Sequence, residues 1–188
     1  MKFVFKLFAL WAVLLVTLVR TPFAAETDPA AVRQQLEVRL LEAAERGETE
    51  VVALFLAPDY LHANRGILEA RNAASHSPLM VAAYNGQLAV VEQLLAAGAD
   101  ACAQDKRGNT ALLGAIFKGE TRAALRLIGA PCGTDARNLA GQTPAMLAAL
   151  FGRKEILAEL EKRGADMTAT DAFGNSVESL ARGEIKTR

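Results

Sequence analysis

The sequence predicts an all-α solenoid, built from stacked pairs of antiparallel helices with turn fingers between the pairs. The first observation is a repeat, because the segment 77–100, SPLMVAAYNGQLAVVEQLLAAGAD, returns in outline 33 residues later and once more after a further 33. The second is a glycine that recurs at the same point of each copy, at Gly86, Gly119 and Gly152. The third is composition: 52% hydrophobic and 22% charged residues suit one domain with a substantial core.

The amino terminus differs from the repeats. Lys2 and Lys6 precede an apolar run over residues 7–19, and TPFAA follows at 21–25, which is the order of regions in a secretory signal peptide. The run is shorter than the ~20 residues of a membrane anchor. We therefore expect residues 1–25 to direct export and to be removed. The alternative is an uncleaved segment that tethers the chain to the inner membrane.

Charge argues against nucleic acid as the partner. Residues 1–25 hold three basic and no acidic side chains, so their removal leaves 18 basic and 21 acidic ones, a net charge of −3. A protein that binds the phosphate backbone needs a basic excess. We expect no nucleic-acid partner, and membrane contact only through the amino-terminal segment.

Residues 29–57 are predicted to form an amino-terminal cap. Apolar residues recur there at three- and four-residue steps, which predicts two helices separated by Gly47. The first of these helices carries more charge than its later counterparts, with Arg33, Glu37 and Arg39. A terminal unit exposes one face to water and needs such a surface.

An insertion follows the cap. The interval from Gly47 to Gly86 is 39 residues rather than 33, and we place the surplus in a loop at about 57–68. Insertions of this kind are often functional. The other interpretation is a longer turn folded onto the cap, with Tyr60 and Leu61 covering apolar surface. The second is favoured, because nothing in the segment is chemically distinctive.

Three full repeats and a carboxyl-terminal cap complete the domain, at about 72–104, 105–137, 138–170 and 171–188. In each repeat a short helix turns at glycine into a second helix. Hydroxyl side chains are placed to cap the first helices by accepting a hydrogen bond from a free backbone amide. These capping residues are Ser77, Thr110 and Thr143, and Ser176 stands at the same offset in the last unit.

These positions together resemble ankyrin repeats, whose pattern is T-P-L-H-x-A-A with a glycine, followed by V-x-x-L-L-x-x-G-A-D. The match covers about residues 69–183, and the whole mature chain, 26–188, if the cap is counted. The resemblance implies a non-catalytic module that binds a protein on its concave face. The chain is similar to small exported, periplasmic bacterial ankyrin proteins. Some of these accompany catalases and support resistance to peroxide, whereas others are immunity proteins that block a toxic envelope effector.

Two departures from the family pattern affect the expected structure. The family's histidine is replaced by Met80, Leu113 and Met146, so we expect an apolar layer at that level. In the second repeat, Pro131-Cys132-Gly133 stands where the others have Gly-Ala-Asp, and we expect the end of its second helix to be distorted.

The sequence contains few residues in patterns that suit catalysis or metal binding. His62 and His76 lie in a loop and a turn, with no cysteine or carboxylate at a metal-ligand spacing. No nucleophile elbow, phosphate loop or HExxH pattern is present in the sequence. We expect a non-enzyme without metal or cofactor. A haem or small-molecule carrier, with His76 as axial ligand, ranks below the binding functions.

The two cysteines, Cys102 and Cys132, occupy adjacent repeats at the same end of the second helices. An exported chain with two cysteines favours a disulfide. Against it, neighbouring helices pack about 10 Å apart, whereas a disulfide needs Cα atoms within about 7 Å. The sequence leaves the bridge and a small buried thiol as alternatives.

The resemblance also predicts which residues bind the partner, because in this family they lie at the ends of the first helices and at the turn tips. Tyr84, Phe117 and Leu150 form an apolar row at one spacing, and lines of exposed aromatics favour an interface. The alternative is that these rings pack against the next repeat. The predicted partner-binding residues are Tyr84, Asn85, Lys106, Arg107, Asn109, Phe117, Lys118, Leu150, Phe151 and Phe173, with His76, Gln142 and Asn175 beside them.

Overall fold

A computed structural model describes residues 28–132 and 134–187, so the signal segment predicted at 1–25 lies outside the described residues. The chain divides within helix α2, after Gln34, and the unit from Gln35 onward contains every later helix. The elements are α2 (Pro29–Arg46), α3 (Thr49–Phe55), α4 (Pro58–Ala63), the 3-10 helix η1 (Arg65–Glu69), α5 (Pro78–Tyr84), α6 (Leu88–Ala96), α7 (Ala111–Lys118), α8 (Thr121–Ile128), α9 (Pro144–Leu150), α10 (Lys154–Lys162) and α11 (Val177–Ala181).

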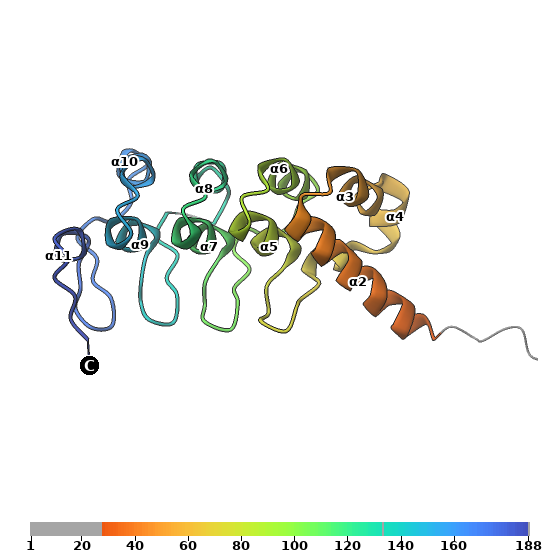
Figure 1. Ribbon diagram of the computed structural model, residues 1–188, viewed down its shortest axis with the longest axis horizontal. Helices are drawn as coiled ribbons and strands as arrows, with labels where there is room; N and C mark the ends of the chain where they lie inside the picture. The colour runs from red at the N-terminus through yellow and green to blue at the C-terminus, as the bar shows by residue number, and fades with distance from the viewer. Residues whose placement is uncertain (1–27, 133, 188) are drawn as a thin grey trace, which may run out of the picture. The chain divides into compact units, whose positions relative to one another are not determined.

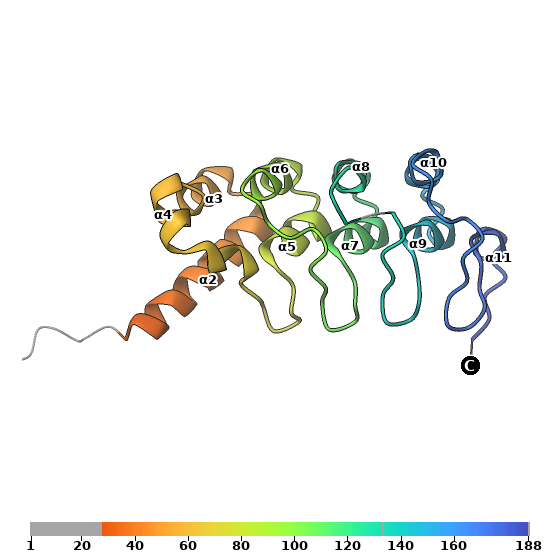
Figure 2. The same cartoon turned by 180° about the vertical axis from the view of Figure 1, so that it is seen from behind.

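The repeats form two rows of helices. Helices α5, α7, α9 and α11 lie side by side in an inner row, and α6, α8 and α10 lie in an outer row (Figures 1 and 2). Four long turns, the fingers, extend from the inner row toward the same side (Figure 1). Within the described residues, extended pairing is limited to one isolated bridge between Thr170 and Ser176. The predicted all-α solenoid of paired helices is confirmed.

The expected caps begin the inner helices. The hydroxyl oxygens of Ser77, Thr110, Thr143 and Ser176 each accept the amide N–H three residues later, at 3.2 to 3.4 Å. The first three hydroxyl residues are almost fully buried. Because a buried amide without a partner is costly, these caps fix where each inner helix starts.

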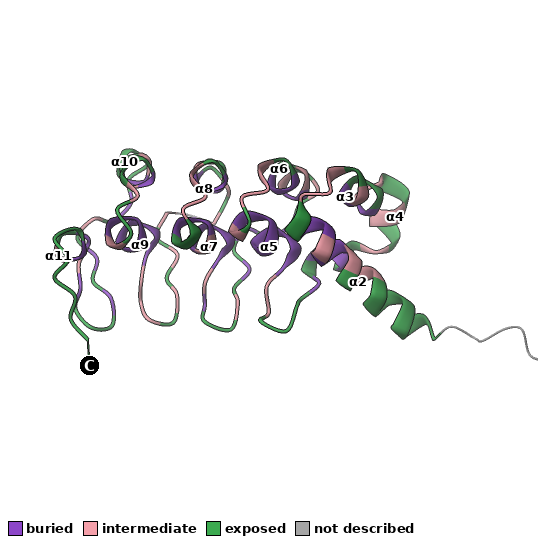
Figure 3. Ribbon diagram, viewed as in Figure 1, coloured by how far each residue is buried: buried purple, intermediate pink, exposed green. Residues whose placement is uncertain are grey.

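The core lies between the two rows and along the inner row (Figure 3). Ala82, Ala115 and Ala148 are fully buried, and their small side chains let neighbouring inner helices approach closely. Met80, Leu113 and Met146 are also buried, so the layer at the family's histidine position is apolar as expected. One polar exception is the Met80 sulfur, which lies 3.5 Å from the Ser77 amide nitrogen and accepts its hydrogen.

The insertion is helical, which corrects the loop expected at 57–68. Helix α4 and η1 occupy this segment. Helix α4 begins at Pro58, and proline suits the first helical position because no amide hydrogen is needed there. Tyr60 packs edge-on against Phe55 of the cap, with ring centroids 5.7 Å apart, and Leu61 also contacts the core. The segment therefore covers apolar surface of the cap, as the favoured interpretation proposed.

The second repeat ends its outer helix early. Helix α8 stops at Ile128, one residue before the register at which α6 ends. The expected distortion is therefore a shortened last turn. Among residues 28–132 and 134–187, no helix combines the length and hydropathy needed to cross a membrane.

Candidate functional site

Each finger is held at its base by one Asn or Asp side chain. Asn72, Asp105, Asn138 and Asp171 recur every 33 residues. In each, Oδ1 accepts the amides two and four residues later, at 2.7 to 3.0 Å. This double acceptance closes the turn and is the reason for an Asn or Asp at this register.

The third residue after each base has a left-handed backbone. Gly108, Gly141 and Gly174 have φ of 77°, 75° and 78°, whereas the first finger places Ser75 there with φ of 65°. Ser75 is the one non-glycine residue with positive φ in the described part of the chain. Glycine adopts this conformation without the Cβ clash that a serine experiences.

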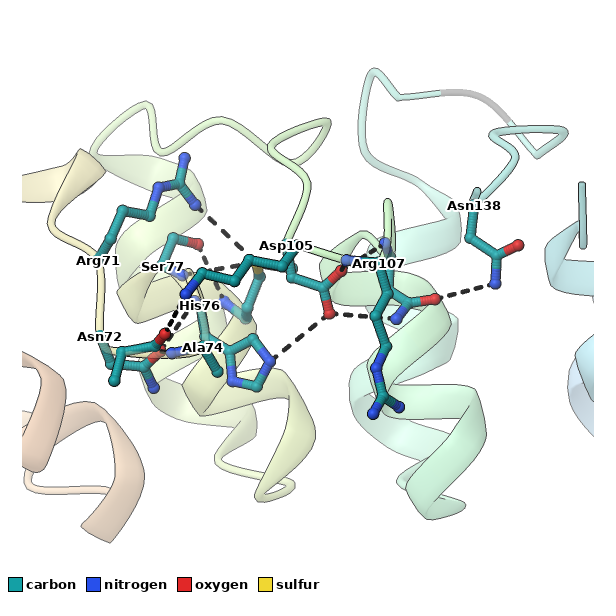
Figure 4. A network of polar contacts seen from close by, with 12 residues as sticks. Arg71, Asn72, Ala74, His76, Ser77, Asp105, Arg107 and Asn138 are labelled. Atoms are coloured by element: carbon teal, nitrogen blue, oxygen red, sulfur yellow. Dashed lines mark hydrogen bonds and ion pairs between the residues drawn. The ribbon is translucent and has the colours of Figure 1, made fainter. Parts of the chain in front are cut away.

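Polar side chains join neighbouring fingers into a chain (Figure 4). The His76 Nε2 lies 3.6 Å from Asp105 Oδ2, which also accepts a hydrogen bond from Asn109 Nδ2 at 3.1 Å. Asn138 Nδ2 donates in turn to Asn109 Oδ1 at 3.0 Å and to Gln142 Oε1 at 3.0 Å. The first three fingers are thereby held in register by side chains.

The finger carboxylates are stabilised in their charged form. Burial opposes ionisation of Asp105, but hydrogen bonds from the amide and side chain of Asn109 and from the Arg107 amide outweigh it. The pKa of Asp105 therefore lies below its usual value. The pKa of Asp171 is lowered in the same way: burial is again outweighed, here by hydrogen bonds from Asn175 and Phe173.

A hollow of about 1020 Å³ lies between the fingers and the inner helices α5, α7 and α9, and we call it the inner groove. Its lining is mainly apolar and aromatic, with cations at the finger tips. The lining residues that concern its chemistry are His76, Tyr84, Asp105, Lys106, Arg107, Asn109, Phe117, Leu139, Gln142, Leu150, Phe151 and Phe173.

Aromatic rings run along the groove from repeat to repeat. His76 stacks on Tyr84 with ring centroids 6.2 Å apart, Tyr84 stacks on Phe117 at 6.3 Å, and Phe117 meets Phe151 edge-on at 5.3 Å. Phe117 stays 50% exposed and Phe151 37% exposed. The Lys118 Nζ lies 5.0 Å from the centre of the Tyr84 ring. We call the rings of His76, Tyr84, Phe117 and Phe151 the aromatic ladder.

This arrangement of helix pairs and fingers agrees with a comparison against known families. A family profile described as "Ankyrin repeats (3 copies)" matches residues 39–105 and 79–171, which together cover more than half of the chain. The chain belongs to the ankyrin-repeat family. Ankyrin repeats typically serve as modules for protein–protein interaction.

Most of the predicted partner-binding residues of this ankyrin protein gather at one place. Eight of them line the inner groove: Tyr84, Lys106, Arg107, Asn109, Phe117, Leu150, Phe151 and Phe173. His76 and Gln142 line it as well. Lys118 adjoins it over Tyr84, whereas the Asn85 side chain donates to the Val81 carbonyl at the end of α5. Asn175 is buried and binds Asp171 instead.

The structure alters the predicted apolar row in one respect. Phe151, not Leu150, continues the line of rings from Phe117, while Leu150 is half-buried against the core. The rings stack between ankyrin repeats, and those of Phe117 and Phe151 also remain exposed, so the two interpretations of the row each describe part of the geometry. Sequence inspection missed Leu139, which is 79% exposed at the third fingertip, although an apolar residue in a turn is a usable signal.

Neither cysteine is bridged in the structure. Cys102 is exposed, Cys132 is half-buried, and both are free thiols. The Cys102 sulfur lies 3.9 Å from the Pro131 carbonyl oxygen of the next ankyrin repeat. Within the described residues, no three His, Cys, Asp or Glu side chains gather in a way that could hold a metal ion.

Proposed function

We propose that this ankyrin protein is a non-catalytic adaptor that binds a protein segment in the inner groove. The aromatic ladder is the observation that carries the proposal. Tyr84, Phe117 and Phe151 come from three successive repeats, and aromatic side chains are enriched in the cores of protein interfaces, where a few large anchors carry most of the binding energy. A stacked row of rings also loses little conformational freedom when a partner covers it.

The charges around the ladder favour an acidic partner. Lys106 and Arg107 are exposed at the second fingertip, and Lys118 is exposed beside Tyr84. In the described lining of the groove, the only carboxylate is Asp105, whose oxygens are already engaged by the finger. The segment that fits presents apolar side chains to the rings and carries Asp or Glu beside them.

We place this adaptor in the bacterial envelope, as an exported and periplasmic protein. The charged start, apolar run and TPFAA end of residues 1–25 support this location. Its partner there is a periplasmic enzyme, such as a catalase whose protection against peroxide it supports. A toxic envelope effector, which the adaptor would neutralise as an immunity protein, is the alternative partner.

Affinity capture with the tagged mature chain from an osmotic-shock extract tests the proposal. One stoichiometric partner is expected with the native protein and is expected to be lost with the double variant Phe117→Ala, Phe151→Ala. Leu54→Ala is the matched control, because Leu54 is 72% exposed but lies on α3, outside the groove. Binding that survives the double variant, or that Leu54→Ala also removes, would reject the groove as the site.

The acidic chemistry of the partner has its own test. Lys106→Glu with Arg107→Glu reverses two charges at a fingertip, and should weaken the captured partner at low salt far more than at high salt. Deletion of the gene then separates the partner classes. Sensitivity to peroxide supports an enzyme partner, whereas killing that depends on a neighbouring toxin gene supports the immunity function.

A further inference from the structure

We propose that Cys102 and Cys132 form a reversible disulfide that clamps the first two full ankyrin repeats together. The Cys102 sulfur already reaches the next repeat, where it lies 3.9 Å from the carbonyl oxygen of Pro131, the residue before Cys132. Cys102 is exposed to an oxidant, and Cys132 is half-buried against the core. The bridge is a property of the folded chain, but its formation in cells rests on the exported location proposed above.

The repeat geometry gives independent support for this reach. Asp135 stands 33 residues after Cys102, and its Oδ1 accepts the amide of Asp166 in the following repeat at 2.9 Å. Cys132 is equivalent to Ala165, the neighbour of Asp166. Cys102 and Asp135, which occupy equivalent positions in successive repeats, therefore each contact the equivalent part of the repeat that follows.

The surroundings of Cys132, Cys102 included, affect its pKa. Burial, followed by a side-chain hydrogen bond with Cys102, raises the pKa of Cys132 to about 12. Cys132 is therefore a thiol at neutral pH, and the exposed Cys102 is the sulfur that first meets an oxidant. A thiolate is the attacking species in disulfide exchange, so the reaction should accelerate as pH rises.

The oxidant is a disulfide, either a protein disulfide in the envelope or oxidised glutathione in the test tube. The Cys102 thiolate attacks one sulfur of it, which forms a mixed disulfide and releases one thiolate. The Cys132 sulfur, after losing its proton, then attacks the Cys102 sulfur and releases the second thiol. The protein loses two protons and two electrons, and the oxidant takes them up as it is reduced to two thiols.

The clamp would act on the inner groove through two fingers. Cys102 lies just before the finger at 105–109, and Cys132 lies before the finger at 138–142. The same junction is crossed by Gln104 Nε2, which donates to the Arg137 carbonyl at 3.3 Å. A covalent bond here would therefore hold the roots of both fingers at one spacing.

Oxidation of the purified mature chain with oxidised glutathione tests the bridge. Trypsin separates the two cysteines into peptides 72–106 and 127–137, since cleavage sites follow Arg71, Lys106, Arg126 and Arg137. We expect these peptides to be linked in unreduced digests, and the intact mass to fall by two hydrogen atoms. We also expect the Tm to rise by roughly 5–10 °C and to return with dithiothreitol.

Cys102→Ser and Cys132→Ser are the controls, and neither should show the Tm rise. Separate glutathione adducts on the two peptides, covalent dimers or persistent free thiols would overturn the proposal. Alkylation of whole cells before extraction then tests the location. The glutathione experiment on purified protein needs neither a partner nor a particular cell compartment. If the disulfide forms in purified protein but is absent in cells, that result would contradict the proposed export and leave the proposed disulfide supported.

Discussion

The rings of Phe117 and Phe151 meet edge-on across two ankyrin repeats, with centroids 5.3 Å apart and planes at 90°. This is a favoured geometry for an aromatic pair, because the positive edge of one ring faces the negative face of the other. Yet half of the Phe117 surface remains in water. The pair therefore stabilises the junction modestly and leaves apolar area for a partner.

Phe117→Ala should separate these two contributions. The free energy of unfolding should fall by about 1 kcal/mol, since an exposed ring loses only its pairing and part of its buried area. Affinity for the captured partner should fall by about tenfold or more, as expected for a central aromatic anchor. Urea unfolding and titration calorimetry measure the two quantities. A loss of affinity that merely tracks the loss of stability would contradict a direct contact.

Ser75→Gly should stabilise the protein. Ser75 holds a φ of 65° at the register where the other three fingers have glycine. An L-residue in this region is strained by about 1–2 kcal/mol, although glycine restores part of that as extra freedom in the unfolded chain. We expect a net gain of roughly 0.5–1 kcal/mol in urea unfolding.

Gly108→Ser is the matched reverse change. A Cβ at Gly108 would lie 2.8 Å from the backbone nitrogen of Leu139, so the neighbouring finger would have to move. This variant should lose more stability than Ser75→Gly gains. If the two variants changed stability in the same direction, backbone strain at this register would not be the cause.

The sequence was sufficient for the repeat architecture, because a 33-residue period constrains many positions together. Glycine turns, hydroxyl caps and small inner residues each have a local physical cause, and all agree in the structure. The prediction of a loop for the insertion was wrong, because Pro58-Asp59 can begin a helix as readily as a turn. Composition alone does not separate these two uses of proline.

The inner groove was predicted in outline but not in its contacts. Spacing placed Tyr84, Phe117 and Leu150 in a row, whereas side-chain direction decides that Phe151 completes the ladder. The chain of polar contacts from His76 through Asp105 and Asn109 to Asn138 depends on distances between fingers, which no local sequence pattern contains. The recurring Asn or Asp at the finger bases was visible in the sequence as a second 33-residue series.

Asn138 tests how the fingers are joined. Asn138→Asp keeps the oxygen that closes the third finger, as Asp105 does in the second, but loses the donor to Asn109. Asn138→Ala loses both. We expect a loss of about 1 kcal/mol for the aspartate and about 2–3 kcal/mol for the alanine in urea unfolding. Equal losses would show that the link between fingers carries the whole effect, and that the turn contributes nothing.

Acid should weaken the fingers. Since the pKa values of Asp105 and Asp171 are lowered in the folded protein, both carboxylates stabilise it above the unfolded value of about 3.9, and this contribution is lost as pH falls through the folded values. We expect the urea midpoint to be nearly constant from about pH 7 to 5 and to fall below about pH 4. Asp105→Asn with Asp171→Asn should be less stable at neutral pH and should lose less on acidification, while the asparagines keep the finger turns, as Asn72 and Asn138 do. An unchanged acid slope in this double variant would show that other carboxylates cause the loss.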